Sequence, residues 1–292
     1  MRSKRDMEHR NGSPPGAQAQ VDKLHDGNRP GKLFIVSLGP GSRSFMTSEA
    51  LQALGEAEIV LGYKTYLDLI PDLLEGKTVV SSGMRKEVDR CQDAIDHALA
   101  GKSVALVSSG DAGIYGMAGL VLDIGRKRGL DFSECGAEPD KSSICVRIIP
   151  GIPAFNAAAS LAGAPLMHDF AAVSLSDHLT PWDVIEKRLG AVAEADFVLA
   201  IYNPRSHSRP DLLEKARRIL LNTRAPDTPV AIVRKAMREG QWKCITTLGQ
   251  LPVEEVDMQS IVIVGNSRTY IWKGWMVTPR GYLDKYTLAE SE

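Results

Sequence analysis

The chain has 292 residues, of which 43% are hydrophobic and 24% are charged, a composition typical of a globular protein with a substantial core. At about 100–200 residues per domain, this length favours one large domain or two of medium size. The formal net charge of −1 provides no overall attraction to nucleic acid or to an anionic membrane, so neither is an expected partner.

The first elements in chain order predict an α/β domain. Residues 1–31 are rich in Gly, Pro, Asn, Gln and charge, which predicts a flexible N-terminal tail. The apolar run at 33–38, ended by a glycine turn, indicates a parallel strand buried on both faces. Thr47 or Ser48 is a candidate cap for the helix that follows, in which Ala50, Leu51 and Leu54 share a face. Further strands are expected at 58–61, 78–81, 103–108 and 145–149, with helices at 87–100 and 114–128 between them. This alternation predicts a mostly parallel sheet over residues 32–151.

A second series of elements begins after Pro150-Gly151. An Ala-rich helix is expected at 154–162. Strands are expected to follow at 171–175, 197–202, 230–233, 243–248 and 261–264. We therefore expect a two-domain α/β fold in which each domain has a mostly parallel or mixed sheet flanked by helices, with domains at 32–151 and 152–285.

The cysteines indicate neither a metal site nor a disulfide framework. Cys91, Cys135, Cys145 and Cys244 form no CxxC pair and have no histidine at ligand spacing, so we expect four reduced thiols and no protein metal. No stretch approaches the roughly 18 apolar residues of a membrane-spanning helix, and the N-terminus lacks the apolar core of a secretory signal. The expected location is the cytoplasm.

Three glycine-bearing loops follow predicted strands, where open α/β sheets bind ligands. The first, Gly39-Pro40-Gly41, is compatible with close backbone approach to a ligand and equally with a tight turn. In the second, at 108–116, Asp111 either caps the next helix or accepts hydrogen bonds from a ligand. The third, at 150–154, permits close helix packing or leaves room for a flat ring.

The first loop excludes two common nucleotide sites. A dinucleotide fingerprint requires a third glycine where Ser44 stands, and the GK[ST] of a phosphate-binding P-loop is missing. Binding of NAD or ATP is therefore not expected.

Taken in order, these segments resemble the tetrapyrrole (corrin/porphyrin) methyltransferase family, which carries GPG, GD[PA]G and PG[IV]xA landmarks. The resemblance covers about residues 32–282. Within the family, several stretches are similar to the precorrin-3B C17-methyltransferase branch of cobalamin biosynthesis. They are SSGDAGIYGMAG at 108–119, SLSDHLTPW at 174–182, ADFVLAIYNPRS at 195–206, PVAIVRKAMREGQ at 229–241 and IVIVGNSRT at 261–269.

The resemblance implies a homodimer of two α/β domains with S-adenosylmethionine in the cleft between them and S-adenosylhomocysteine as a product. It also implies possible hand-off of the tetrapyrrole to other enzymes of the corrin pathway. Asn203 and His178 stand where an apolar residue is found or expected in relatives. The residues that the resemblance places near the cofactor are Pro40, Ser109, Gly110, Asp111, Ile114, Ala154, Tyr202, Asn203 and Ala236.

The implied reaction is methylation of C17 of precorrin-3B, or of its cobalt form, with ring contraction. The sulfonium methyl is already activated, so alignment of the reactants lowers the barrier by about 7–11 kcal/mol and no protein nucleophile is needed.

The substrate's carboxylates suit binding by Arg and Lys, although a solvated surface charge is the alternative interpretation of each such residue. The candidates for substrate binding are Arg43, Arg85, Lys86, Arg90, Arg205, Arg209, Arg234, Lys235 and Arg238, with Trp182 as a stacking or helix-anchoring residue. The candidates for acid–base catalysis are Asp177, Glu87 and His178. Cobalt would arrive with the substrate.

Three alternatives remain open. A tetrapyrrole methyltransferase of another position specificity would place the methyl on a different carbon. An RNA ribose methyltransferase of the same fold would bind RNA at physiological salt, although the near-neutral charge and the lack of a basic aromatic platform argue against it. A noncatalytic cofactor-binding subunit would bind S-adenosylmethionine without turnover.

Overall fold

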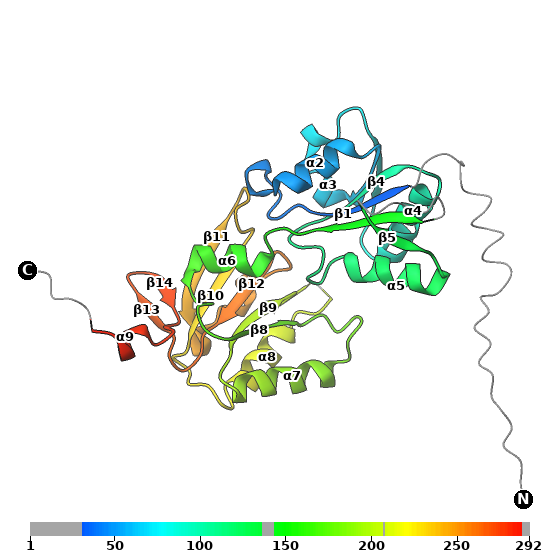
Figure 1. The fold of residues 1–292 in the computed structure, drawn as a ribbon. Helices are drawn as coiled ribbons and strands as arrows, with labels where there is room; N and C mark the ends of the chain where they lie inside the picture. Colours follow the sequence, from blue (N-terminus) through cyan, green and yellow to red (C-terminus); the bar gives the residue numbers. More distant parts are fainter. Residues whose placement is uncertain (1–30, 136–142, 207, 288–292) are drawn as a thin grey trace, which may run out of the picture. The chain divides into compact units, whose positions relative to one another are not determined.

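The computed structural model describes residues 31–135, 143–206 and 208–287. The chain divides into two compact units, Met1–Gly151 and Ile152–Glu292, whose elements are labelled in Figure 1. The tail expected at 1–31 lies outside the described residues, except for Gly31. Both units contain sheets flanked by helices, so the predicted α/β fold class is confirmed.

The first unit contains a six-stranded sheet in the order β3-β2-β4-β1-β6-β5. Every pairing in it is parallel. Its strands are β1 (Lys32–Ser37), β2 (Ile59–Tyr63), β3 (Thr78–Ser82), β4 (Ser103–Ser108), β5 (Phe132–Glu134) and β6 (Ile144–Ile149). The strand β1 lies between β4 and β6, so its carboxyl end is near the middle of one sheet edge.

Helices cover both faces of this sheet, as the continuous apolar run of β1 predicts. Leu33 and Ile35 pack in one cluster with side chains of α4 (Glu87–Leu99) and α5 (Ala118–Arg128). Phe34 and Val36 point to the other face and pack with α2 (Ser48–Glu56) and α3 (Lys64–Leu67). Thr47 is the cap of α2, because its Oγ1 accepts from the Ala50 N–H at 3.1 Å. Burial of each of these apolar β1 side chains contributes about 1.5–3 kcal/mol to the stability of the fold.

The helix expected at 114–128 begins four residues later, at Ala118. Tyr115 has φ +53°, which no α-helix accommodates. The segment before α5 is instead a turn closed by the Ala118 N–H donating to the Ala112 carbonyl at 3.0 Å. The chain therefore leaves β4 through an irregular loop before it becomes helical.

The second unit contains a mixed sheet in the order β11-β10-β12-β9-β8, in which β8 and β9 are parallel and the other pairings antiparallel. On one face lie α7 (Trp182–Glu194) and α8 (Leu212–Leu220), which adjoin each other in Figure 1, and on the other lies α6 (Ala154–Ala162). The strands are β8 (Phe170–Ser174), β9 (Val198–Tyr202), β10 (Pro229–Arg234), β11 (Trp242–Thr247) and β12 (Ser260–Val264).

Smaller elements complete the two units. A three-stranded sheet in the second unit joins β13 (Tyr270–Trp272), β14 (Trp275–Val277) and β7 (Gly163–Ala164). The short helix α9 (Tyr282–Lys285) follows it. The 3-10 helices are η1 (Arg43–Phe45), η2 (Pro71–Leu73), η3 (Leu248–Gln250) and η4 (Val253–Glu255).

The expectation of four reduced thiols is wrong for two of them. Cys135 and Cys145 form a disulfide with Cα atoms 4.9 Å apart, whereas Cys91 and Cys244 are free. The reason is strand pairing, because β5 and β6 lie side by side and Cys135 directly follows β5. Their sequence separation of 10 residues gives no sign of this proximity.

The described part of the chain contains neither a helix that could span a membrane nor a cluster of metal-ligating side chains. None of its helices has the length and apolar character required to cross a membrane. Within the same residues, no three His, Cys, Asp or Glu side chains are grouped so that they could hold a metal ion.

Candidate active site

The loops after β1 and β4 are joined through their backbones. The Gly39 N–H donates to the Gly110 carbonyl at 3.0 Å, and the Gly110 N–H donates back to the Gly39 carbonyl at 2.8 Å. Gly39 has φ +58° and Gly110 has φ +70°, a conformation that favours glycine. Pro40 and Ser109 are neighbours of these glycines, so four residues of the glycine loops lie together at the carboxyl edge of the sheet.

Asp111 extends this connection to the loop after β6. One carboxylate oxygen accepts from the Gly113 N–H at 2.8 Å, and the other accepts from the Gly151 N–H at 3.0 Å. A Cβ placed on Gly151 would lie 2.6 Å from the Gly110 carbonyl oxygen. Three strand-end loops are therefore packed backbone against backbone.

The capping alternative for Asp111 is wrong for the helix that follows. α5 begins at Ala118, its N-cap is Met117, and that cap receives no side-chain hydrogen bond. Asp111 instead organises the turn that precedes the helix, in which the Ile114 N–H donates to the Asp111 carbonyl at 3.2 Å. Ile114 is thereby held beside Asp111 in this turn.

Three further site candidates of the first unit lie after β3. Arg85 is exposed, has φ +65°, and its N–H donates to the Glu87 carboxylate at 3.3 Å. Arg90 is only 4% exposed and donates to Ser82 Oγ at 2.7 Å and to the Gly83 carbonyl at 3.0 Å. Arg90 therefore fastens α4 to the end of β3, and its contact with substrate stays a prediction.

In the second unit, three cofactor candidates share one apolar cluster. Ala154, Tyr202 and Ala236 all pack, partly buried, against the core beneath α6. The Tyr202 hydroxyl accepts from the Phe155 N–H at 3.3 Å, so the end of β9 is fixed to the first turn of α6. The structure thus brings together residues that are far apart in the sequence.

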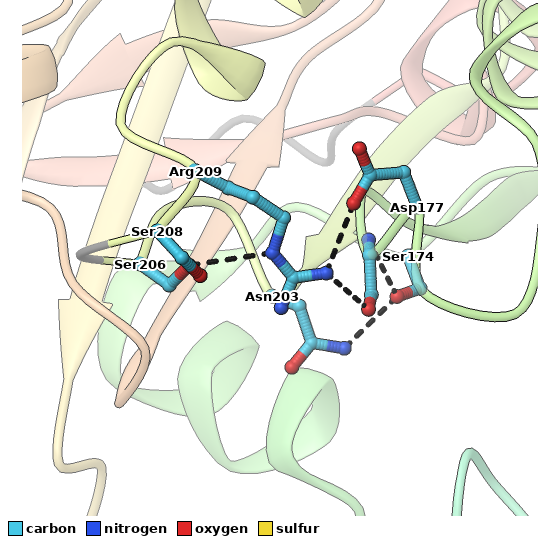
Figure 2. Close-up of polar contacts among 7 residues, drawn as sticks. Ser174, Asp177, Asn203, Ser206, Ser208 and Arg209 are labelled. Atoms are coloured by element: carbon cyan, nitrogen blue, oxygen red, sulfur yellow. Dashed lines mark hydrogen bonds and ion pairs between the residues drawn. The ribbon is translucent and has the colours of Figure 1, made fainter.

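Asn203 belongs to a polar network that spans the ends of β8 and β9 (Figure 2). Its backbone has φ +49°, and its side-chain amide donates to Ser174 Oγ at 2.9 Å. Arg209 donates through one terminal nitrogen to Ser176 Oγ at 2.7 Å and to Asp177 Oδ1 at 3.1 Å. This network fixes the loop that carries Asp177 to the loop that carries Asn203.

The remaining candidates occupy varied surroundings. Arg205 is bonded to the Pro210 carbonyl, to the Glu254 carbonyl and to the Glu254 carboxylate. Trp182 begins α7 and packs against the core with Lys215 Nζ 5.7 Å from its ring centre, which favours the helix-anchoring role. His178 is exposed. Lys235 has φ +49° in the turn after β10 and is half-buried.

The free cysteines are unsuited to nucleophilic chemistry. Burial raises the pKa of the Cys91 thiol to about 12, and burial also raises the pKa of Cys244. Both remain protonated at neutral pH, whereas the thiolate is the nucleophile.

Sequence reasoning missed the roles of Ser37 and Ser174 in these loops, and it missed the pairing of Arg209 with Asp177. Ser37 Oγ is fully buried and accepts from the Ala112 N–H at 2.8 Å, and the only sign of it in the sequence is a polar residue ending an apolar strand. Ser174 holds Asn203, and Arg209 holds Asp177. Neither pairing has a sequence signal, because the partners are about thirty residues apart.

The family model for tetrapyrrole (corrin/porphyrin) methylases matches residues 32–252. A protein of Salmonella typhimurium, named probable cobalt-factor III C(17)-methyltransferase, is 53% identical over 86% of this chain and 99% of its own length. A protein of Priestia megaterium, named cobalt-factor III methyltransferase, is 48% identical over 90% of this chain. This chain spans only 47% of the length of the Priestia protein.

A solved structure gives the same result. The crystal structure of the methyltransferase CobJ superimposes with a TM-score of 0.77 at 37% identity, covering 85% of this chain and all of that one. The parallel sheet of the first unit, the glycine-built loops at its carboxyl edge and the extent of these matches lead to one conclusion: this chain belongs to the tetrapyrrole (corrin/porphyrin) methylase family.

Proposed function

We propose that this chain is a methyltransferase that transfers a methyl group from S-adenosylmethionine to C17 of cobalt-factor III or precorrin-3B, with ring contraction, in cobalamin biosynthesis. The observation that carries the proposal is the match to the Salmonella protein, at 53% identity over nearly its whole length. The name of that relative specifies the carbon.

The loops of the first unit fit S-adenosylmethionine on their own geometry. Gly39 and Gly110 present backbone without side chains, so a ligand can approach the main chain closely. Each Asp111 oxygen accepts one backbone N–H and retains capacity for a ligand hydroxyl or amine. We propose that Pro40, Ser109, Gly110, Asp111 and Ile114 contact the cofactor, together with Ala154, Tyr202, Asn203 and Ala236 of the second unit.

When bound, S-adenosylmethionine supplies an activated methyl group on a sulfonium. The chain's own task is then to align a ring carbon with that methyl, and positioning of this kind lowers a barrier by about 7–11 kcal/mol. Rigid loops suit this task, because a misplacement of about 1 Å costs up to a hundredfold in rate. The backbone contacts of Gly39, Gly110 and Gly151 provide such rigidity.

For proton transfer during the reaction we propose Glu87 and His178 as candidates, since Glu87 is the first residue of α4 and His178 lies in the loop after β8. Asp177 was a third candidate, but its carboxylate is already paired with Arg209. Among the predicted substrate ligands, Arg85, Lys235 and Trp182 remain proposals. Arg205 is held by Glu254, and Arg90 is held inside the first unit.

A homodimer and a cytoplasmic location also remain proposals. The Cys135–Cys145 disulfide is the observation that bears against a reducing compartment, where such bonds are rare. Labelling of free thiols in protein extracted under acid quench would measure how much of this bond exists in the cell. A fully bonded pair would argue against the cytoplasm.

Turnover of purified protein tests the proposed function. We expect a mass gain of one methyl group when the protein is incubated with S-adenosylmethionine and cobalt-factor III or precorrin-3B, accompanied by a change in the absorbance spectrum. Cofactor binding without any methyl gain would identify a noncatalytic subunit. Retention of RNA at physiological salt would favour the RNA methyltransferase alternative.

A further inference from the structure

The polar network at the ends of β8 and β9 contains Arg209, one of the basic residues that the sequence offers for holding a substrate carboxylate (Figure 2). The side chain of Arg209 is 24% exposed and that of Asp177 is 38% exposed. The two strands are parallel neighbours, so both loops that follow them meet at one edge of the sheet. Ligands of α/β sheets bind at such edges.

Serine hydroxyls hold the Arg209 guanidinium independently of Asp177. Its Nη1 donates to Ser176 Oγ at 2.7 Å, and its Nε donates to Ser206 Oγ at 3.4 Å. The backbones of Ser206 and Arg209 also exchange hydrogen bonds with each other at 3.0 and 3.3 Å. The guanidinium is therefore oriented by its own loop and by Ser176, whether or not Asp177 is paired with it.

The Asp177 contact is the weak part of this arrangement. A carboxylate can bind a guanidinium through two parallel hydrogen bonds, yet Asp177 uses only Oδ1, against a single nitrogen at 3.1 Å. Exposed ion pairs of this kind contribute about 0–1 kcal/mol. A carboxylate of a ligand that engaged the guanidinium fork with both oxygens would exceed that contribution.

We propose that Arg209 binds a carboxylate of the tetrapyrrole substrate, and that Asp177 is the resident anion which this carboxylate displaces. The identity of the ligand rests on the proposed function, whereas the exchange rests on the geometry of the network. Asp177 then acts as a negatively charged competitor that discriminates against weakly anionic ligands. This role differs from acid–base catalysis, and the two roles predict opposite effects of removing its charge.

Binding of uroporphyrin III, a stable tetrapyrrole polycarboxylate, to the full chain tests the proposal without requiring turnover. We expect Arg209→Gln to weaken binding about tenfold or more, because hydrogen bonds to charged groups are among the stronger polar contacts. We expect Arg209→Lys to show an intermediate loss, since the charge remains but the fork does not. Asp177→Asn should tighten binding about two- to fivefold, in line with the small contribution of an exposed ion pair.

The control is Arg218→Gln, which removes an exposed arginine of α8. Arg218 Nε lies 2.9 Å from Glu214 Oε1, and neither residue belongs to the network of Figure 2. This variant should leave the affinity for uroporphyrin III unchanged. Thermal melting of every variant, compared with the wild type, separates loss of folding from loss of binding. If Asp177→Asn lowers both the melting temperature and the affinity, the Asp177–Arg209 ion pair serves only to stabilise the fold, and the proposal is overturned.

Kinetics with the methyl acceptor provide the second readout. The exchange predicts a raised KM with little change in kcat for Arg209→Gln, and a lowered KM for Asp177→Asn. Loss of kcat in Asp177→Asn at unchanged KM would assign acid–base catalysis to Asp177 and reject the exchange. Failure of the wild type to bind uroporphyrin III also rejects it, whereas binding of uroporphyrin III without methyl transfer would reject only the proposed function.

Discussion

In the first unit the strand-end loops are joined mainly through backbone atoms, whereas in the second unit the corresponding loops are joined through side chains. Gly39 and Gly110 exchange backbone hydrogen bonds, and Gly151 packs directly on the Gly110 carbonyl. At the ends of β8 and β9, Ser174 holds Asn203 and Arg209 holds Asp177. The same location in two α/β units is therefore stabilised by two different means.

This difference determines how each region should respond to substitution. A backbone junction requires the absence of a side chain and a particular φ, so almost any replacement of its glycines is harmful. A side-chain network has separate bonds, each worth about 1 kcal/mol, that can be removed singly. The first region should therefore show large effects that combine stability with cofactor binding, and the second should show smaller, separable ones.

The largest effect is expected from Gly110→Val. A valine at φ +70° is strained by about 3 kcal/mol, and its side chain would stand where the cofactor is proposed to approach. We expect lower thermal stability and no measurable binding of S-adenosylhomocysteine by calorimetry. Gly76→Val is the matched control, because Gly76 has φ +73° in an open turn with nothing within 4 Å. The control should lose stability but bind normally, and wild-type affinity in Gly110→Val would remove Gly110 from the site.

A second effect in the first region is expected from Asp111→Ala. It leaves the N–H groups of Gly113 and Gly151 without their acceptor, at a cost of about 2 kcal/mol. We expect about tenfold weaker binding of S-adenosylhomocysteine in addition, from loss of a charged acceptor. Asp111→Asn should fall between alanine and wild type, since the amide oxygen replaces one acceptor. Unchanged calorimetric affinity in Asp111→Ala would leave Asp111 with a structural role alone.

A smaller effect is expected from Ser174→Ala in the second region. It removes the acceptor of the Asn203 amide and of the Ser176 N–H, at about 1 kcal/mol in urea unfolding. Asn203→Gly should cost a similar amount, because glycine tolerates φ +49° and only the hydrogen bond from the side-chain amide to Ser174 is lost. Asn203→Ala should cost more, since it adds backbone strain. Equal stability of the glycine and alanine variants would contradict this account of Asn203.

The smallest effect is expected from Glu254→Gln, which removes the ion pair with Arg205. The Glu254 side chain is 83% exposed, so the loss should be below about 0.5 kcal/mol and should vanish at high salt. Denaturation at low and high ionic strength measures it. A loss above about 2 kcal/mol would show that this pair supports the second region as strongly as Asp111 supports the first.

The sequence predicted the elements best where burial and hydrophobic pattern agree. The strand at 103–108 and the helix at 154–162 have the predicted bounds in the structure, because an apolar run and an Ala-rich stretch each end at turn residues. The predicted start of α5 was four residues too early. Helix propensity gives no sign that the backbone of Tyr115 has a positive φ. The α8 helix was overlooked, although its buried Leu212, Leu213, Ala216 and Leu220 carry the helical spacing.

The candidate site was predictable to the extent that it depends on glycine. Gly39 and Gly110 stand out as turn residues after strands, and the structure pairs their backbones. The pairing of Arg209 with Asp177, and of Cys135 with Cys145, depends on which segments the fold makes neighbours. Local sequence patterns contain no such information, so these contacts appeared only in the structure.

The measurement that tests the central claim most directly is the position of the transferred methyl group. The purified chain would be incubated with S-adenosylmethionine carrying a ¹³C-labelled methyl and with cobalt-factor III or precorrin-3B, and the product analysed by NMR. The account predicts one labelled methyl, bonded to C17 of a contracted ring. A label on any other carbon, or no transfer by protein that binds both ligands, would contradict it.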